Sequence, residues 1–397
     1  MKPVITQINS TTYYLGTNDR TKPLFENLWP IPDGVAYNSY FIKDEKTVVI
    51  DTVDSAFAES FLDKVDYLLS GKPLDYLIIN HMEPDHAGSI ALLRQRHPEV
   101  KMVVNKRTLP MLNAFHGRQE PVVVVDENGE LNIGSRSLRF YLAPMVHWPE
   151  VMFTYDPENC VLFSADAFGS YGALDGGLFD DEVDYDRFLS ETYRYYANII
   201  AKYGRQVQNA LKKASGLEIK TICSTHGPVW RSHIPEVIAL YDKLSRYETE
   251  PGVVIAYGSM YGCTEEMAEV IAKSLSHHGV KHIRVYHAGM TNASYILADL
   301  FRYNGLILGS PTYNMELWPP IASLVEKIKT RYIPGHILAT FGSGAWNGAV
   351  EYKLSPLAEE FGWQEVAKPV ITIGKADEEA YERLWELGRQ MAEAVLK

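Results

Sequence analysis

The chain has 397 residues, more than one ordinary core accommodates, so two domains are expected. Its formal charge of −12 argues against nucleic acid and against an anionic membrane surface as partners, because neither attracts an acidic protein. No apolar run approaches the roughly 20 residues that span a bilayer, the N-terminal stretch has no signal-peptide core, and the 3 cysteines form no disulfide framework. We therefore expect a cytoplasmic protein with no membrane partner.

The first 248 residues are predicted to form many short strands with a few helices between them. One long helical stretch, about Asp186–Ala214, precedes the last of these strands. Two β-rich runs separated by helices favour two packed sheets with helices outside. The predicted strands are Thr47–Thr52, Tyr76–Asn80, Lys101–Asn105, Val122–Asp126, Leu138–Ala143, Val161–Ser164 and Ile219–Ser224.

The segment after the predicted strand Tyr76–Asn80 is the most informative of the chain. Two imidazoles and two carboxylates stand within six residues, as His81, Glu83, Asp85 and His86. A rigid strand can aim such side chains from the loop at its exit. Nitrogen and oxygen donors without a thiolate suit iron, zinc or manganese better than a structural zinc–thiolate site. For this segment alone, a polar turn that caps the next helix is the alternative.

Three more metal-competent side chains, His147, Asp166 and His226, follow later predicted strands. The combined set has four histidines and three carboxylates, too many for one tetrahedral ion. We therefore predict a dinuclear metal site in which one carboxylate bridges two ions. The remaining histidines lack this context and are interpreted as surface or helix-end residues: His97, His116, His233, His277, His278, His282, His287 and His336.

From Gly252 onward, strands and helices alternate regularly, after a charged joint at Tyr247–Gly252. Five such units make a parallel, doubly wound α/β sheet, so the predicted domains are 1–248 and 252–397. The predicted strands are Val253–Tyr257, Ile283–Tyr286, Leu306–Gly309, Ile337–Phe341 and Val370–Ile373. The predicted helices lie near Glu265–His278, Ala293–Tyr303, Trp318–Arg331, Ala349–Phe361 and Glu378–Leu396.

Three loops at one edge of this second sheet indicate a flavin site. In the first, Tyr257–Glu265, glycines and the hydroxyls of Ser259 and Thr264 can hold a phosphate at a helix N-terminus. Gly342 and Gly344 lack the spacing of a dinucleotide motif, so FMN is preferred over NAD or FAD. Aromatic residues of the other loops can stack on the flavin ring. The predicted cofactor-binding residues are Ser259, Met260, Tyr261, Gly262, Cys263, Thr264, Pro311, Thr312, Tyr313, Asn314, Ser343, Gly344, Ala345, Trp346, Asn347 and Gly348.

The spacing of the seven metal-competent residues resembles the ligand set of flavodiiron proteins, and the phosphate loop is similar to that of flavodoxins. Hydrolases of the metallo-β-lactamase fold usually carry a histidine where Glu83 stands. The resemblance covers the whole chain. It implies an N-terminal metallo-β-lactamase-like αββα sandwich and a C-terminal flavodoxin-like sheet. It also implies two non-haem iron ions, one held by His81, Glu83 and His147, the other by Asp85, His86 and His226, with Asp166 bridging.

The same resemblance implies an oxidoreductase, in which FMN passes electrons to the di-iron site for reduction of O2 to water or of NO to nitrous oxide. It implies a head-to-tail homodimer or a dimer of dimers, and it favours Tyr195 as a residue near the metal pocket. Tyr196 and Trp148 are weaker candidates for that place. No rubredoxin-like cysteine pairs follow Lys397, so we expect a separate electron donor, either a rubredoxin-like protein or a reduced deazaflavin.

Two other function classes stay open. The main alternative is a metallo-β-lactamase-like zinc hydrolase with a fused flavodoxin-like regulatory domain. Glu83 counts against it, and zinc has no redox function that a flavin could serve. The third class is an electron carrier with a vestigial metal domain, against which the complete seven-residue set counts. The choice between O2 and NO also stays open, because both reactions share the same metal ligands.

Overall fold

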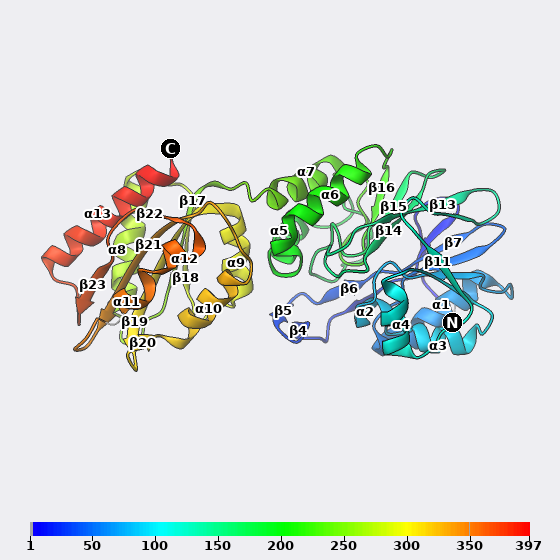
Figure 1. Cartoon of the computed structure of the whole chain (residues 1–397), viewed down its shortest axis with the longest axis horizontal. Coiled ribbons are helices and arrows are strands. Elements are labelled where there is room, and N and C mark those ends of the chain that lie inside the picture. The colour runs from blue at the N-terminus through cyan, green and yellow to red at the C-terminus, as the bar shows by residue number, and fades with distance from the viewer. Residues whose placement is uncertain (1–2, 349) are drawn as a thin grey trace. The chain divides into compact units, whose positions relative to one another are not determined.

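The computed structural model describes residues 3–348 and 350–397, and the chain divides into two compact units between Ser245 and Arg246 (Figure 1). Each unit has its own core of buried apolar side chains. The domain limits 1–248 and 252–397 remain our proposal.

The first unit contains a seven-stranded and a five-stranded sheet. The seven-stranded sheet has the order β1 (Thr6–Gln7), β2 (Thr12–Tyr14), β7 (Tyr40–Lys43), β8 (Thr47–Ile50), β9 (Tyr76–Ile78), β10 (Lys101–Asn105) and β11 (Val122–Val125). The five-stranded sheet has the order β12 (Glu130–Asn132), β13 (Ser137–Leu142), β14 (Met152–Asp156), β15 (Val161–Phe163) and β16 (Thr221–Cys223). Two short ribbons pair β3 (Thr17–Asp19) with β6 (Val35–Tyr37), and β4 (Leu24–Phe25) with β5 (Trp29–Pro30).

The two sheets of the first unit share one apolar core. Ile50 and Ile78 from one sheet belong to the same buried cluster as Phe140 and Phe163 from the other. Burial of each such side chain contributes about 2 kcal/mol to the free energy of folding. The shared cluster therefore holds the two sheets together and fixes the positions of the strand exits. The helices are α1 (Ala58–Leu69), α2 (Pro84–Ala87), α3 (Ile90–Arg96), α4 (Thr108–His116), α5 (Tyr185–Tyr195), α6 (Gly204–Ala214) and α7 (Ile234–Ser245), with a 3₁₀ turn at Ser55–Phe57.

The single long helix predicted over Asp186–Ala214 is wrong. Helix α5 ends at Tyr195 and continues as a π-helical segment, Tyr196–Ile200, and a 3₁₀ turn before α6 begins at Gly204. Ala201 has a φ of 25°, which no regular helix permits. Gly204, the one glycine in this stretch, also lowers its helical propensity. The interruption begins directly after Tyr195, and π-helical segments of this kind often lie at functional sites.

The second unit is a parallel sheet in which β17 (Glu250–Tyr257) lies between β18 (Ile283–His287) and β19 (Tyr303–Tyr313), followed by β21 (Ile337–Gly344) and β23 (Val370–Ile373). The short strands β20 (Glu316–Leu317) and β22 (Gln364–Glu365) pair with β19 and β21. Helices cover both faces (Figure 1): α8 (Cys263–His277) and α13 (Glu378–Val395) on one, α9 (Ala293–Arg302) and α10 (Pro319–Lys329) on the other, with α11 (Val350–Leu354) and α12 (Leu357–Phe361) following β21.

One helix predicted for the second unit, near Ala349–Phe361, is two helices in the structure. Pro356 stands between α11 and α12, and proline both lacks a donor and disfavours a helical residue before it. Ala349 lies outside the described residues. The chain reverses its winding direction between β17 and β19, and such a switch point is where doubly wound sheets bind ligands.

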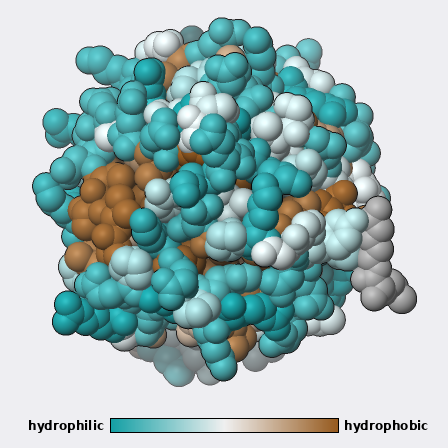
Figure 2. Space-filling model, turned by 90° about the vertical axis from the view of Figure 1, so that its right-hand side faces the viewer, coloured by the Kyte–Doolittle hydropathy of each residue, from teal (hydrophilic) through white to brown (hydrophobic). Residues whose placement is uncertain are grey.

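The face of the first unit that Figure 2 shows is largely hydrophilic, with apolar areas between polar side chains. This mixture is ordinary for exposed protein surface. Among the described residues, no helix has both the length and the apolar character needed to cross a bilayer.

Candidate metal centre and flavin pocket

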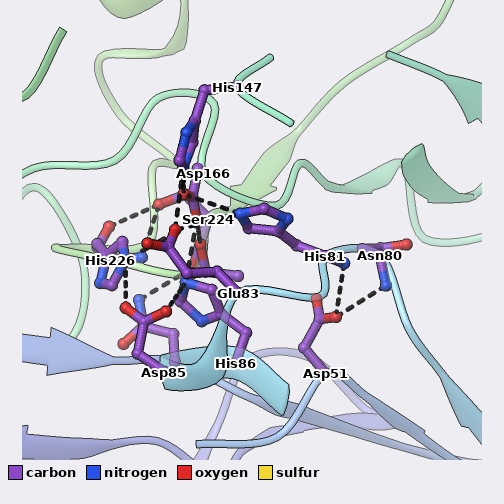
Figure 3. A network of polar contacts seen from close by, with 12 residues as sticks. Asp51, Asn80, His81, Glu83, Asp85, His86, His147, Asp166, Ser224 and His226 are labelled. Atoms are coloured by element: carbon purple, nitrogen blue, oxygen red, sulfur yellow. Dashed lines mark hydrogen bonds and ion pairs between the residues drawn. The ribbon is translucent and has the colours of Figure 1, made fainter. Parts of the chain in front are cut away.

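Loops from both sheets of the first unit deliver the seven predicted metal ligands to one place (Figure 3). His81 and Glu83 follow β9, and Pro84 opens the short helix α2, a position that proline favours, so that Asp85 and His86 lie in its first turn. The amide and hydroxyl of Thr52 both donate to the His86 carbonyl at 2.7 Å and hold that turn in place. His147, Asp166 and His226 come from the loops after β13, β15 and β16.

The seven side chains form two buried groups. His81, Glu83, His147 and Asp166 make one group, and Asp85, His86 and His226 make the other. Within each group the possible ligand atoms all lie within 4.8 Å of one another. That spacing allows one cation to contact every member of a group.

Asp166 faces both groups. Its Oδ2 lies 2.9 Å from His147 Nε2 and 3.5 Å from His81 Nε2. Its Oδ1 lies 3.1 Å from His86 Nε2 and 3.8 Å from His226 Nε2. The side chain is fully buried, so this carboxylate is placed to bridge two ions.

Buried polar atoms without hydrogen bonds test whether the pocket fits metal ions. Both carboxylate oxygens of Asp85 and the Nε2 atoms of His86 and His226 are buried and make no hydrogen bond among the described residues. Asp85 lies 3.3 Å from each of those two nitrogens, in ion-pair contact only. Burying such atoms is unfavourable without compensation, and a coordinated cation would use all four. The donor set therefore fits two cations of the kind that nitrogen and oxygen ligands prefer.

The second unit has a cavity of about 300 Å³ at the carboxyl ends of β17, β19 and β21. All the predicted cofactor-binding residues line this cavity except Gly262 and Gly348. Gly262 instead precedes α8 with a φ of 90°, a conformation that glycine tolerates best. Met315 and Gly374 also line the cavity, and the sequence prediction omitted them.

The cavity has the features that a flavin phosphate and ring require. The Thr312 hydroxyl is buried and makes no hydrogen bond among the described residues, and the N-terminus of α8 offers amides to an anion. A Cβ added to Gly344 would lie 1.8 Å from the Asn347 carbonyl, so only glycine fits there. Tyr261 and Trp346 are 90% and 84% exposed and can cover an aromatic ring. These residues fit FMN.

Sequence models of two families match the chain: an ODP family beta lactamase over residues 35–227 and a flavodoxin over residues 255–384. An anaerobic nitric oxide reductase flavorubredoxin of Escherichia coli is 33% identical over 364 residues, which are 90% of this chain and 76% of that protein. The chain belongs to the flavodiiron protein family.

Two solved flavodiiron structures have the same fold as this chain. Rubredoxin oxygen:oxidoreductase of Desulfovibrio gigas is 28% identical with a TM-score of 0.95, and 99% of each chain is covered. The flavodiiron protein of Giardia intestinalis is 26% identical with a TM-score of 0.93, covering 100% of this chain and 98% of that one. The predicted fold class and family are thereby confirmed.

Hydrogen bonds behind the ligands of this flavodiiron protein fix the orientation of two imidazoles. His81 Nδ1 donates to Glu150 Oε1 at 2.8 Å, and His226 Nδ1 donates to the Ala36 carbonyl at 2.8 Å. Each bond turns the Nε2 atom toward the cluster. Asp51 accepts from the backbone amides of Asn80 and His81 at 2.8 and 3.2 Å and so holds the backbone of the loop (Figure 3).

The carboxylates raise the pKa values of the imidazoles. Burial alone disfavours a charged imidazole, but Asp85 and Asp166 outweigh it and raise the pKa of His86 to about 9. Asp166 and Glu83 likewise raise the pKa of His147 to about 9 against the effect of burial. Burial lowers the pKa of His81 as well, but the neighbouring carboxylates, Asp166 most of all, raise it well above its usual value.

Metal loading is expected to release protons. Without a bound ion these three imidazoles hold protons at about pH 7.5, and metal ligation requires their neutral form. We expect release of at least about two protons per chain, measured by titrating chelator-treated protein with metal in two buffers of different ionisation enthalpy. Because the folded pKa values are raised, the stability that they give is complete below about pH 6.5 and is lost as pH rises through about 9. Melting temperatures of chelated protein that do not fall over this range would contradict the assignment.

The structure separates the three aromatic candidates. Tyr195 is fully buried with its ring 5.5 Å from that of His226, and its hydroxyl makes no hydrogen bond among the described residues. Trp148 meets the His81 ring edge-on at 5.3 Å. Tyr196 packs against Tyr241 at 5.1 Å instead. Tyr195 and Trp148 therefore belong to the wall of the metal pocket.

Sequence reasoning missed three features. Glu150 follows His147 by three residues, a local signal that could have been used. Glu26, in the turn between β4 and β5, carries no such signal. Desolvation, and then the charge of Glu83, raise the pKa of Glu26 to about 7, although part of the side chain is exposed. The interpretation of His336 as a surface or helix-end residue is wrong: it is buried directly before β21, with Nε2 2.7 Å from the Leu300 carbonyl.

Proposed function

We propose that this flavodiiron protein is an oxidoreductase that takes electrons from a redox partner through FMN to a non-haem di-iron site. Its reaction would be reduction of O2 to water, of NO to nitrous oxide, or both. The observation that carries the proposal is Asp166, whose two oxygens face two separate groups of buried nitrogen and oxygen donors. Relatives are named for nitric oxide reduction in one case and oxygen reduction in the other, which supports this reaction class.

The residues have distinct proposed roles. His81, Glu83 and His147 would hold one iron ion, Asp85, His86 and His226 the other, and Asp166 both. Ser259 and Thr264 would bind the FMN phosphate, and Trp346 and Tyr313 would cover the ring. Iron and FMN, when bound, supply the electron-transfer chemistry that no side chain can supply. The protein positions these groups and excludes bulk water from the buried donors.

The proposed reactions consume protons as well as electrons. Each O2 converted to two waters takes four electrons and four protons, and two NO converted to one nitrous oxide and one water take two of each. The hydroxyl of Tyr195 is a buried donor beside His226 with no partner of its own among the described residues. We assign it to delivering or orienting a proton at the substrate.

Replacing Tyr195 by phenylalanine is expected to lower turnover by up to about 100-fold, the low end of what a positioned acid contributes. Thermal stability should stay unchanged or rise, because a buried hydroxyl without a partner costs free energy. Tyr155→Phe is the matched control: its hydroxyl donates to the Glu218 carbonyl at 2.7 Å, so it should lose about 1 kcal/mol of stability and no turnover. Unchanged turnover of Tyr195→Phe, with iron content equal to wild type, would refute the assignment.

The decisive experiment measures metal and flavin content and then compares O2 uptake with anaerobic NO consumption, both with the same reduced donor and as kcat/KM. Two irons, one FMN and at least one of the two activities are expected per chain. Two zinc ions with neither activity would sink the proposal. Hydrolysis of a lactam or thioester by that protein would then favour the alternative zinc hydrolase with a regulatory flavodoxin-like domain.

Partners and location are part of the proposal. We propose a separate donor, a rubredoxin-like protein or a reduced deazaflavin, and a head-to-tail homodimer or dimer of dimers. Tyr261 and Trp346 stand exposed at the mouth of the flavin cavity, which supports a surface that another protein covers. A cytoplasmic location agrees with three unpaired cysteines. Sedimentation of a fully active monomer would contradict the dimer.

A further inference from the structure

We propose that Glu150 is a positioning residue that makes the two metal sites of this centre unequal. It places a negative charge behind His81, whereas neither His86 nor His226 has a carboxylate behind its ring. The inference rests on the proposed di-iron function. Glu150 Oε1 accepts from His81 Nδ1 at 2.8 Å, and both side chains are fully buried. The metal-facing atom of that ring, Nε2, lies on the opposite side, toward Glu83 and Asp166.

Hydrogen bonds hold one carboxylate oxygen of Glu150 and the backbone on either side of it, while its Oε2 is buried and makes no hydrogen bond among the described residues. The amide of Met82 donates to the same Oε1 at 2.9 Å, so one oxygen holds both the ring of His81 and the backbone that follows it. The Asn105 side chain donates to the Glu150 carbonyl at 2.6 Å, from the end of β10. Arg107 donates to the carbonyl of the preceding Pro149 at 3.1 Å. A carboxylate fixed in this way can set a ring orientation rather than follow it.

The imidazoles differ in what stands behind them. His226 Nδ1 donates to a neutral backbone carbonyl, that of Ala36, at 2.8 Å. His86 Nδ1 is buried and makes no hydrogen bond among the described residues. His81 alone of these three donates to a carboxylate. The groups of ligands that share Asp166 are therefore not equivalent, although their donor types are similar.

The difference has a chemical consequence. An anionic acceptor behind an imidazole raises the basicity of the nitrogen that faces the metal. A more basic ligand favours the higher charge of an iron ion, ferric over ferrous. The site of His81, Glu83 and His147 should therefore hold the more easily oxidised ion of the pair. The site of Asp85, His86 and His226 should hold the ion that more readily stays ferrous.

The test is Glu150→Gln, because the amide oxygen can still accept both hydrogen bonds while the charge is lost. Iron affinity of one site should fall about 10- to 100-fold. At that iron the preference for the ferric state should fall about tenfold, which corresponds to an upward shift of about 59 mV in a one-electron midpoint potential. Mössbauer spectra of isotopically labelled iron should show one altered site and one unaltered site. Glu150→Asp, which keeps the charge, should restore most of the wild-type spectrum.

Asp51→Asn is the matched control. Asp51 is also a buried carboxylate under the same loop, but it accepts from backbone amides and touches no imidazole ring. Its charge acts on both His86 and His81, so any effect of its loss should be shared by both iron sites. A Glu150→Gln protein in which both sites change alike, or neither changes, would overturn the inference.

The outcomes also separate this inference from the proposed function. Wild-type protein with two irons and reductase activity, but with Glu150→Gln indistinguishable from it, refutes only the role of Glu150. If the wild type binds zinc and lacks reductase activity, the proposed function fails. Chelator competition then decides the inference, which requires one of the two zinc ions to bind about 10- to 100-fold more weakly in Glu150→Gln. If Glu150→Gln does not fold, the wild-type protein still tests the inference: its Mössbauer spectra must show two inequivalent irons that are oxidised at different potentials, and two equivalent irons would overturn it.

Discussion

Asp166→Asn should lose most of its iron and should lower the rate of O2 or NO reduction by at least about 100-fold. Loss of a residue that only hydrogen-bonds to a metal ligand costs up to about 100-fold, and loss of a ligand itself should cost no less. Of the seven proposed ligands, Asp166 alone has one oxygen toward each group, at 2.9 Å from His147 and 3.1 Å from His86. In asparagine, one of these oxygens becomes an NH2 group, which cannot bind a cation. The change therefore affects both metal sites.

Iron analysis, flavin absorbance and turnover measure this outcome. FMN content should equal that of wild type, because the flavin cavity lies in the other compact unit with its own core. The control is Asp181→Asn, which removes an equal charge from an exposed ion pair with Arg231 and should change iron content and turnover little. Retention of two irons by Asp166→Asn would mean that this carboxylate does not bridge.

The metal ligands could be proposed from the sequence because each follows the end of a strand within eight residues. Strand exits at one edge of a packed pair of sheets must converge, and residue type then names the candidates. What lies behind the ligands could not be found in this way. Asp51 and Ala36 reach the loop of His81 and the ring of His226 through tertiary pairing across 30 and 190 residues of chain. No local pattern marks such contacts.

Prediction of secondary structure failed where helical periodicity of the sequence concealed a change in backbone geometry. The run from Asp186 to Ala214 keeps apolar residues at helical spacing, yet the chain inserts a π-helical segment after Tyr195. Packing of Tyr195 against His226 and Tyr171, at 5.5 and 5.1 Å between ring centroids, belongs to the tertiary structure and outweighs local preference. In the flavin cavity, the strand-exit loops were found, whereas Met315, one residue past the predicted segment that ends at Asn314, was missed.

Gly344→Ala should lower FMN affinity at least about tenfold, a change of about 1.4 kcal/mol. Turnover with a protein or deazaflavin donor should fall in proportion to the flavin lost. A Cβ at this position would meet the Asn347 carbonyl at 1.8 Å, a distance that no structure tolerates. The clash is with backbone, so relief requires the loop of Ala345 and Trp346 to move away from the cavity that it lines. Flavin fluorescence after dilution measures the affinity.

Gly216→Ala is the matched control, since the same added methyl group would meet nothing within 4 Å. It should keep full flavin content and turnover. Iron content should equal wild type in both variants. Gly344 belongs to a different compact unit from the proposed metal ligands, and a methyl group added at Gly216 would disturb no neighbour. Gly344→Ala would thus keep its iron and lose flavin, the reverse of Asp166→Asn. Full FMN occupancy in Gly344→Ala would contradict this prediction, because it would mean that the loop can move to relieve the clash without loss of FMN affinity.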